Sequence, residues 1–152
     1  MIILKFGGTS VGSVERIREV ANLSNNTQRK VVVLSAMSGT TNSLIEIAEY
    51  LYKKNHDSAN EAINKLELNY YEVTNELFST TEYKKKGIDL IQSHFSHIKS
   101  FTQDMFTLFE EKAILAQGEL ISTALLHYYF NEQKIESVLI PALNFMRTDK
   151  DG

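Results

Sequence analysis

The stretch from Ile2 to Gly12 constrains the fold more than any other part of the chain. It begins with an apolar, β-prone run broken only by Lys5, and it continues with glycine and hydroxyl residues. Apolar residues then recur at helical spacing over residues 13–21, which predicts a strand, a glycine turn and a helix. Such a turn directs backbone N–H groups toward an anion, and Lys5 could add a positive charge. We expect Gly7 and Gly8 to permit positive φ and close approach of a phosphate.

A second predicted strand ends in a similar loop. Residues 30–36 are β-branched and apolar without alternation, which is typical of a strand buried on both faces of a parallel sheet between helices. The first predicted helix, with Ser13 as its N-cap, would connect the two strands as a right-handed βαβ unit. Residues 35–42 form a loop of small and hydroxyl residues, and a second helix is predicted after it. Because ligands bind at the carboxyl edge of parallel strands, we expect both loops to line one site.

The segment 57–117 is predicted to be an inserted pair of antiparallel helices. It contains no proline and a single glycine, and its apolar and aromatic residues recur at helical spacing up to Phe109. A capping sequence near Thr80 divides it, so the second helix should be much the longer. We interpret the aromatic stripe as core packing rather than a cofactor site. His94 and His97 could meet on one helix face, but a third metal ligand is missing from the pattern.

Two further features follow the helical segment. Gly118 is expected to break the long helix, so that Glu119 begins a new one, where the helix dipole favours an acidic residue. Residues 135–142 are predicted to form a third strand that ends at Pro141.

Composition limits the functional classes. The chain has 152 residues, of which 43% are hydrophobic and 23% charged, and this is ordinary for one soluble domain. The absence of cysteine excludes disulfides and thiolate metal sites. The net charge of −3 argues against a nucleic-acid partner, and no apolar run is long enough to span a membrane. No signal peptide is visible, so we expect a cytoplasmic protein.

The glycine-rich start is neither of the two common phosphate-binding patterns, because its lysine precedes the glycines and their spacing differs from the dinucleotide motif. Residues 5–12 (Lys-Phe-Gly-Gly-Thr-Ser-Val-Gly) instead resemble the opening of the aspartokinases, a branch of the amino-acid kinase family. Residues 35–42, 118–122 and 144–149 resemble later signatures of that family, in the right order and spacing. The first match is specific by itself, whereas the other three are specific only in combination with it.

The resemblance implies an α/β fold. This would be the N-terminal part of an amino-acid kinase (carbamate kinase-like) three-layer sandwich, with a mostly parallel sheet and the inserted hairpin. The chain would be the N-terminal portion of the catalytic domain over residues 1–152, without the C-terminal nucleotide half and the ACT regulatory domains. Such a portion is expected to be inactive alone, and the full-length protein is expected to be a homo-oligomer.

The resemblance also implies a reaction and a set of site residues. The reaction is ATP- and Mg²⁺-dependent phosphorylation of the side-chain carboxylate of L-aspartate, the first step toward lysine, threonine and methionine. Lys5 would be catalytic and would bind the nucleotide together with Gly7, Gly8, Thr9 and Ser10. Ser35 and Thr41 would bind the substrate's side-chain carboxylate, and Glu119 would bind its ammonium group. No residue is assigned to a metal ion.

Two alternatives remain open at this point. A sibling kinase acting on glutamate, N-acetylglutamate, carbamate or UMP would share the Lys-x-Gly-Gly start, although Thr9, Ser10 and the inserted helices favour aspartate. The chain could also be a non-catalytic assembly module in which the helical hairpin is an interface, and the aromatic stripe would then be partly exposed.

Overall fold

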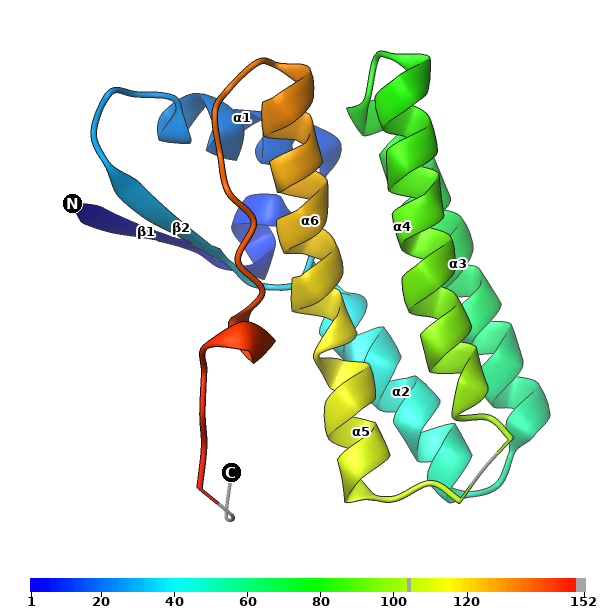
Figure 1. Ribbon diagram of the computed structural model, residues 1–152. Helices are drawn as coiled ribbons and strands as arrows, with labels where there is room; N and C mark the ends of the chain where they lie inside the picture. Colours follow the sequence, from blue (N-terminus) through cyan, green and yellow to red (C-terminus); the bar gives the residue numbers. More distant parts are fainter. Residues whose placement is uncertain (104, 150–152) are drawn as a thin grey trace.

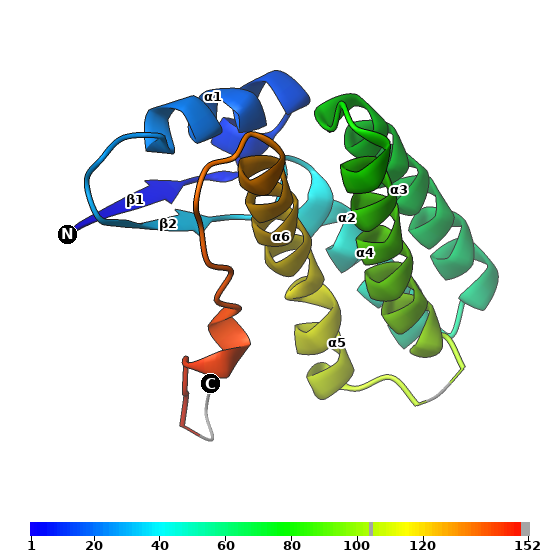
Figure 2. The ribbon, with the colours of Figure 1, turned by 45° about the horizontal axis from the view of Figure 1, so that its top comes forward.

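The computed structural model describes residues 1–103 and 105–149, so Asp104 of the predicted hairpin and residues 150–152 of the predicted domain lie outside the described part. The described elements are, in chain order, β1 (Ile2–Phe6), the 3-10 helix η1 (Gly8–Val11), α1 (Val14–Ser24), β2 (Lys30–Leu34), α2 (Thr40–Tyr52), α3 (His56–Leu77), α4 (Thr81–Ser100), α5 (Leu108–Leu115), α6 (Gln117–Glu132) and the 3-10 helix η2 (Ala142–Asn144). Helix α6 lies between the sheet and the α3–α4 pair in both views (Figures 1 and 2). Within these residues, no helix is long and apolar enough to cross a membrane.

The predicted βαβ unit is confirmed. Strands β1 and β2 are parallel, with Ile3 opposite Val31 and Lys5 opposite Val33. The Ser13 side chain caps α1 by accepting a hydrogen bond from the Arg16 N–H. The α1 stripe of Val14, Ile17, Val20 and Ala21 is buried, which anchors the helix to the core.

The prediction that β2 is buried on both faces is wrong for the described residues. Leu34 is 7% exposed, whereas Val31 and Val33 are 44% and 43% exposed. Val32 and Phe6 pack against the hydrophobic core, while Lys5 shares the open face with Val33. A continuous apolar strand is buried on both faces only if other elements cover both of them. The residues of the strand do not show whether such elements are present.

Helices α3 and α4 form the predicted antiparallel hairpin, and its aromatic stripe is core packing as expected. Tyr70 and Phe95 are both 0% exposed, and their ring centroids are 5.9 Å apart. The expectation of a much longer second helix is wrong, because α3 has 22 residues and α4 has 20.

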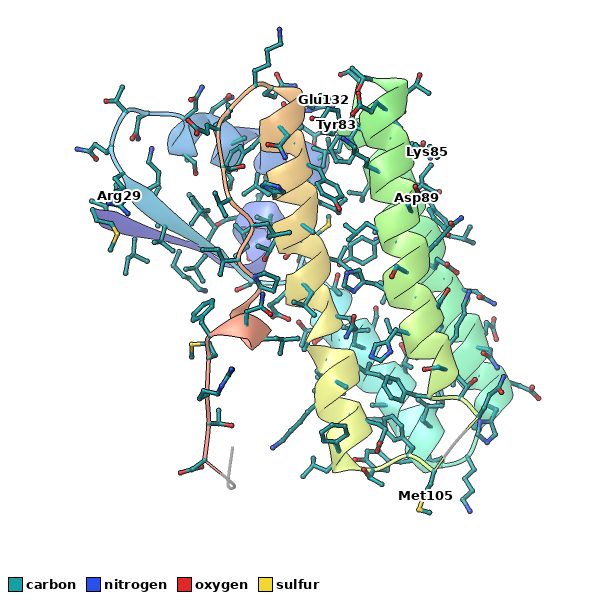
Figure 3. The ribbon with its side chains drawn as sticks, in the orientation of Figure 1. Arg29, Tyr83, Lys85, Asp89, Met105 and Glu132 are labelled. Carbon is teal, nitrogen blue, oxygen red and sulfur yellow. The ribbon has the colours of Figure 1, made fainter. Side chains whose placement is uncertain are left out.

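The apolar stripe predicted to continue to Phe109 is interrupted after α4. The Phe101 N–H donates to the Ile98 carbonyl and ends the helix, and Met105 and Phe109 are 83% and 76% exposed. Met105 lies at the opposite end of the hairpin from Tyr83 and Glu132 (Figure 3). A capping box then starts α5, since the Thr107 N–H donates to Glu110 Oε2 at 2.9 Å. This Thr-x-x-Glu pattern was visible in the sequence and marks the break.

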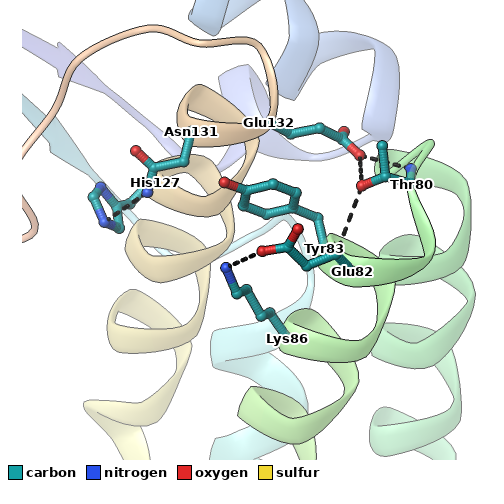
Figure 4. Close-up of polar contacts among 7 residues, drawn as sticks. All are labelled: Thr80, Glu82, Tyr83, Lys86, His127, Asn131 and Glu132. Atoms are coloured by element: carbon teal, nitrogen blue, oxygen red, sulfur yellow. Dashed lines mark hydrogen bonds and ion pairs between the residues drawn. The ribbon is translucent and has the colours of Figure 1, made fainter.

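A glutamate on α6 fastens that helix to the start of α4. Glu132 Oε1 accepts from the backbone N–H groups of Ser79 and Thr80 and from Thr80 Oγ1, at 2.8–2.9 Å (Figure 4). The Thr80 side chain in turn caps α4 by accepting from the Tyr83 N–H. The predicted cap at Thr80 is therefore confirmed, and α6 supplies a second acceptor to the same helix end.

The predicted strand over residues 135–142 is absent from the described structure. The segment is extended and lies along α6, where His127 Nδ1 is 2.9 Å from Ser137 Oγ. Val138 is 82% exposed and Ile140 is 60% exposed. Apolar, β-branched residues favour a strand, but a strand also requires a neighbouring backbone to complete its hydrogen-bond ladder.

Candidate active site

The glycine loop after β1 packs directly against the loop after β2. A Cβ placed on Gly8 would lie 3.1 Å from the Ala36 carbonyl oxygen, and one on Gly12 would lie 2.9 Å from Ser38 Cβ. The distance at Gly12 is too short for a side chain unless Ser38 shifts, and the distance at Gly8 is shorter than most Cβ contacts, so close packing favours glycine at both positions. The two loops therefore contact each other at the carboxyl edge of the sheet, and that they line one ligand site stays a prediction.

The expectation that Gly7 and Gly8 adopt positive φ is wrong. Gly7 has φ −79° and ψ 172°, and the positive-φ glycine in the described residues is Gly39, at φ 84°. The chain leaves β1 in extended geometry and enters the 3-10 helix η1, so no left-handed residue is needed there. Gly39 is the N-cap of α2, where a left-handed residue favours glycine.

The start of α6 packs against the same loop. A Cβ on Gly118 would lie 2.7 Å from Ala36 Cβ and 3.1 Å from Thr40 Cγ2, and Ser122 Oγ donates to the Ser35 carbonyl at 2.8 Å. Gly118 does not break the helix as predicted, because the junction between α5 and α6 is at Ala116. Gly118 is instead a contact residue that lets α6 approach the β2 loop closely.

Positive charge lies beside the glycine loop. Lys5 is exposed, and its Nζ is 3.6 Å from the position that a Cβ of Gly7 would occupy, so the ammonium lies over the turn. The Arg16 guanidinium donates to the Thr9 carbonyl. Arg16 is exposed in the first turn of α1, and no motif of the sequence indicated that its side chain would contact the loop.

The predicted substrate residues lie on elements that touch one another. Ser35 is half-buried at the end of β2, Thr41 is exposed in the first turn of α2, and Glu119 is exposed in the first turn of α6. Glu119 also acts on Tyr70: burial raises the pKa of that phenol to about 12, and the Glu119 carboxylate contributes in the same direction. The structure therefore brings the three segments together, while their roles stay predictions.

A cleft of about 520 Å³ opens beside this region, between α2 and α3. Ser38, Gly39 and Thr40 contribute to its wall, but Ser35, Thr41 and Glu119 do not line it. The cleft therefore lies beside the predicted substrate residues and is not lined by them.

The two histidines of the hairpin contact an amide side chain and an aromatic side chain. His94 Nδ1 is 2.7 Å from Gln117 Oε1, and the His97 ring stacks edge-on against Phe101 with centroids 4.8 Å apart. Across residues 1–103 and 105–149, no group of three or more His, Asp or Glu residues gathers in a way that could hold a metal ion.

The contact at Gly118 gives a first prediction. Gly118→Ala should lower the unfolding free energy by about 1–2 kcal/mol, because an overpacking cost near the upper end of the usual range of about 1–3 kcal/mol outweighs the roughly 1 kcal/mol gained in helix propensity. For a chain of this size the melting temperature should fall by about 2–8 °C, and amides of residues 35–41 should exchange faster.

Gly87→Ala is the matched control, because its Cβ would lie 2.5 Å from Thr74 Cγ2 inside the hairpin. It should lower the melting temperature without accelerating exchange in residues 35–41. Faster exchange there in both variants would show that the contact at Gly118 has no special relation to the loop.

Comparison with known proteins decides the family. The sequence profile of the amino acid kinase family matches residues 1–151. This chain belongs to the amino acid kinase family. The match extends over strands, loops and hairpin alike, so the resemblance noted in residues 5–12 holds for the whole described fold.

Curated relatives are aspartokinases. The chain is 34% identical over 135 residues to chloroplastic aspartokinase 2 of Arabidopsis thaliana, covering 86% of this chain and 24% of that protein. It is 48% identical over 65 residues to the aspartokinase of Geobacillus stearothermophilus, covering 40% of this chain and 16% of that protein. The chain therefore spans a quarter or less of the length of these relatives.

Solved structures confirm the fold. Aspartokinase III of E. coli, in complex with lysine and aspartate, superposes with a TM-score of 0.71 at 22% identity, over 90% of this chain and 30% of that one. Its complex with aspartate and ADP gives 0.69 at 24% identity, over 88% of this chain and 29% of that one. The α/β fold with a parallel sheet and an inserted hairpin is thus the amino acid kinase fold.

Proposed function

We propose that this chain is the N-terminal part of an aspartokinase catalytic domain, which phosphorylates the side-chain carboxylate of L-aspartate with ATP. The observation that carries this proposal is the meeting of the three motif segments at the β2 loop, where Gly8, Gly12 and Gly118 all approach residues 36–40 closely. The relatives named aspartokinases, and the aspartate and ADP in the E. coli complexes, support the choice of substrate.

The substrate would be held by complementary polar groups. The hydroxyls of Ser35 and Thr41 would donate to the side-chain carboxylate, and the Glu119 carboxylate would bind the ammonium group. A carboxylate and an ammonium form a charge-assisted pair, which is stronger than a neutral hydrogen bond. Ser122 supports this arrangement, since its hydroxyl holds the Ser35 backbone at 2.8 Å.

Phosphoryl transfer would rely on position and charge. A substrate carboxylate oxygen forms a bond to the γ-phosphorus of ATP while the bond from that phosphorus to the β–γ bridging oxygen breaks, leaving ADP. A carboxylate is already a nucleophile, so no base is required. The Lys5 ammonium and the backbone of Gly7 and Gly8, with Thr9 and Ser10 beside them, would stabilise charge on the phosphoryl group.

Mg²⁺ would bind together with the nucleotide in this scheme. Protein carboxylates do not gather into a cage in the described residues, and Mg²⁺ in kinases is held largely by substrate phosphates. When bound, it would neutralise phosphate charge, while Lys5 provides the fixed positive charge of the protein.

A substrate panel tests the proposal. The kinase to assay is the full-length protein in which this chain is joined to the C-terminal part of its own catalytic domain, and we refer to it as the joined kinase. We expect ADP release that depends on L-aspartate, with little response to glutamate or N-acetylglutamate. A preference for glutamate or N-acetylglutamate would assign the chain to a sibling kinase, and no response to any of them would favour the assembly module.

A further inference from the structure

A tyrosine of the helical hairpin reaches the substrate loop. Tyr70 lies on α3 and is 0% exposed, and its hydroxyl is 2.8 Å from Thr40 Oγ1. Thr40 is the first residue of α2 and is 3% exposed, so this hydrogen bond is shielded from water. The two residues are thirty positions apart, and either hydroxyl can be the donor.

The same threonine is also held from a second side. Its methyl group lies 3.1 Å from the position that a Cβ of Gly118 would occupy, so the start of α6 packs against Thr40. The carboxylate of Glu119, the next residue, contributes to the raised pKa of Tyr70, which is about 12. Tyr70 thus remains a neutral phenol at physiological pH, able to donate or accept one hydrogen bond at the junction of α2, α3 and α6.

The buried hydroxyl is not needed for packing. A phenylalanine would fill the same space against Phe95, and a hydroxyl in a dry site is costly unless it has a partner. The hydroxyl therefore matters through Thr40, whose neighbour Thr41 is a proposed ligand of the substrate carboxylate.

We propose that Tyr70 is a positioning residue of the aspartate site: it fixes Thr40 and thereby sets the place of Thr41 relative to Glu119. This inference rests on the proposed function and assigns the inserted hairpin a part in substrate binding.

The test compares Tyr70→Phe with Tyr71→Phe in the joined kinase. Tyr71 is the matched control, because it lies on the same helix and its hydroxyl donates to Glu67 Oε1 at 3.1 Å, away from the loop. We expect Tyr70→Phe to raise the KM for aspartate about tenfold, as for one buried hydroxyl left without a partner. The kcat and the KM for ATP should change less than twofold, and Tyr71→Phe should behave as the unaltered enzyme.

A second variant guards against misfolding of the first. Thr40→Val removes the partner hydroxyl at nearly constant volume and should raise the KM for aspartate by a similar factor. The double variant Tyr70→Phe/Thr40→Val should be no worse than either single variant, because each removes the same hydrogen bond.

Three results would overturn the inference. The first is a KM for aspartate within twofold of the unaltered enzyme in Tyr70→Phe. The second is an equal loss in Tyr71→Phe, which would indicate a general effect on the hairpin. The third is the absence of aspartate-dependent activity in the unaltered joined kinase, which refutes the proposed function and the inference together, whereas the first two refute only the inference.

Discussion

Replacing Lys5 with alanine in the joined kinase should lower kcat by about 10²–10³-fold, the effect of removing one group that stabilises charge in a transition state. The Lys5 ammonium lies over Gly7, where a phosphate could approach the backbone. Its charge matters most while the phosphoryl group transfers, so the KM for aspartate should change little. Steady-state kinetics with aspartate and ATP measure both constants.

Lys5→Arg should restore only part of the activity, since a planar guanidinium does not replace a compact ammonium in a narrow turn. Lys30→Ala is the matched control on the paired strand. The Lys30 ammonium donates to the carbonyls of Ser24 and Asn26, at 2.7 and 2.8 Å, near the opposite end of the sheet. Its loss should leave kcat within twofold. A Lys5→Ala enzyme within twofold of the unaltered kcat would remove Lys5 from the mechanism.

The second large effect is expected at Glu119. Glu119→Gln keeps the shape of the side chain and removes the charge that would pair with the substrate ammonium. Truncating one partner of a charged pair costs about 2–5 kcal/mol. Since Glu119 is exposed, we expect the lower part of that range, which corresponds to a rise of about 30–100-fold in the KM for aspartate.

The control for Glu119 is Glu111→Gln on the preceding helix, where the carboxylate accepts from the Tyr52 hydroxyl at 2.7 Å. That variant should bind aspartate normally. In NMR titrations of this chain with aspartate, we expect weak shifts near Ser35, Thr41 and Glu119 that vanish in Glu119→Gln. Shifts confined to the α3–α4 hairpin, or equal in both variants, would place the substrate elsewhere.

Local patterns predicted a large part of the fold. The strand from Ile2, the cap at Ser13, the strand from Lys30 and the cap at Thr80 are all where the sequence indicates, because each depends on residues near in the chain. The break after Ser100 was also encoded locally, in Thr107 and Glu110, but the apolar stripe concealed it.

Predictions that depend on distant partners were less accurate. Residues 135–142 have the composition of a strand but no ladder in the described structure, and Val31 and Val33 have the composition of a covered face but remain open. In both cases the residue types favour burial or strand pairing. The element that would cover or pair with them has to be supplied by another part of the fold.

The sequence by itself determined which residues are candidates for the chemistry: Lys5 before its glycines, the hydroxyl loop after the second strand, and Glu119 at a helix start. The tertiary structure decided how these segments meet, through the contacts of Gly8, Gly12 and Gly118 with residues 36–40. It also revealed Arg16 beside Thr9 and Tyr70 bonded to Thr40. The physical reason is that a motif depends on the chemistry of neighbouring residues, whereas the last two contacts join positions whose side chains only packing brings together.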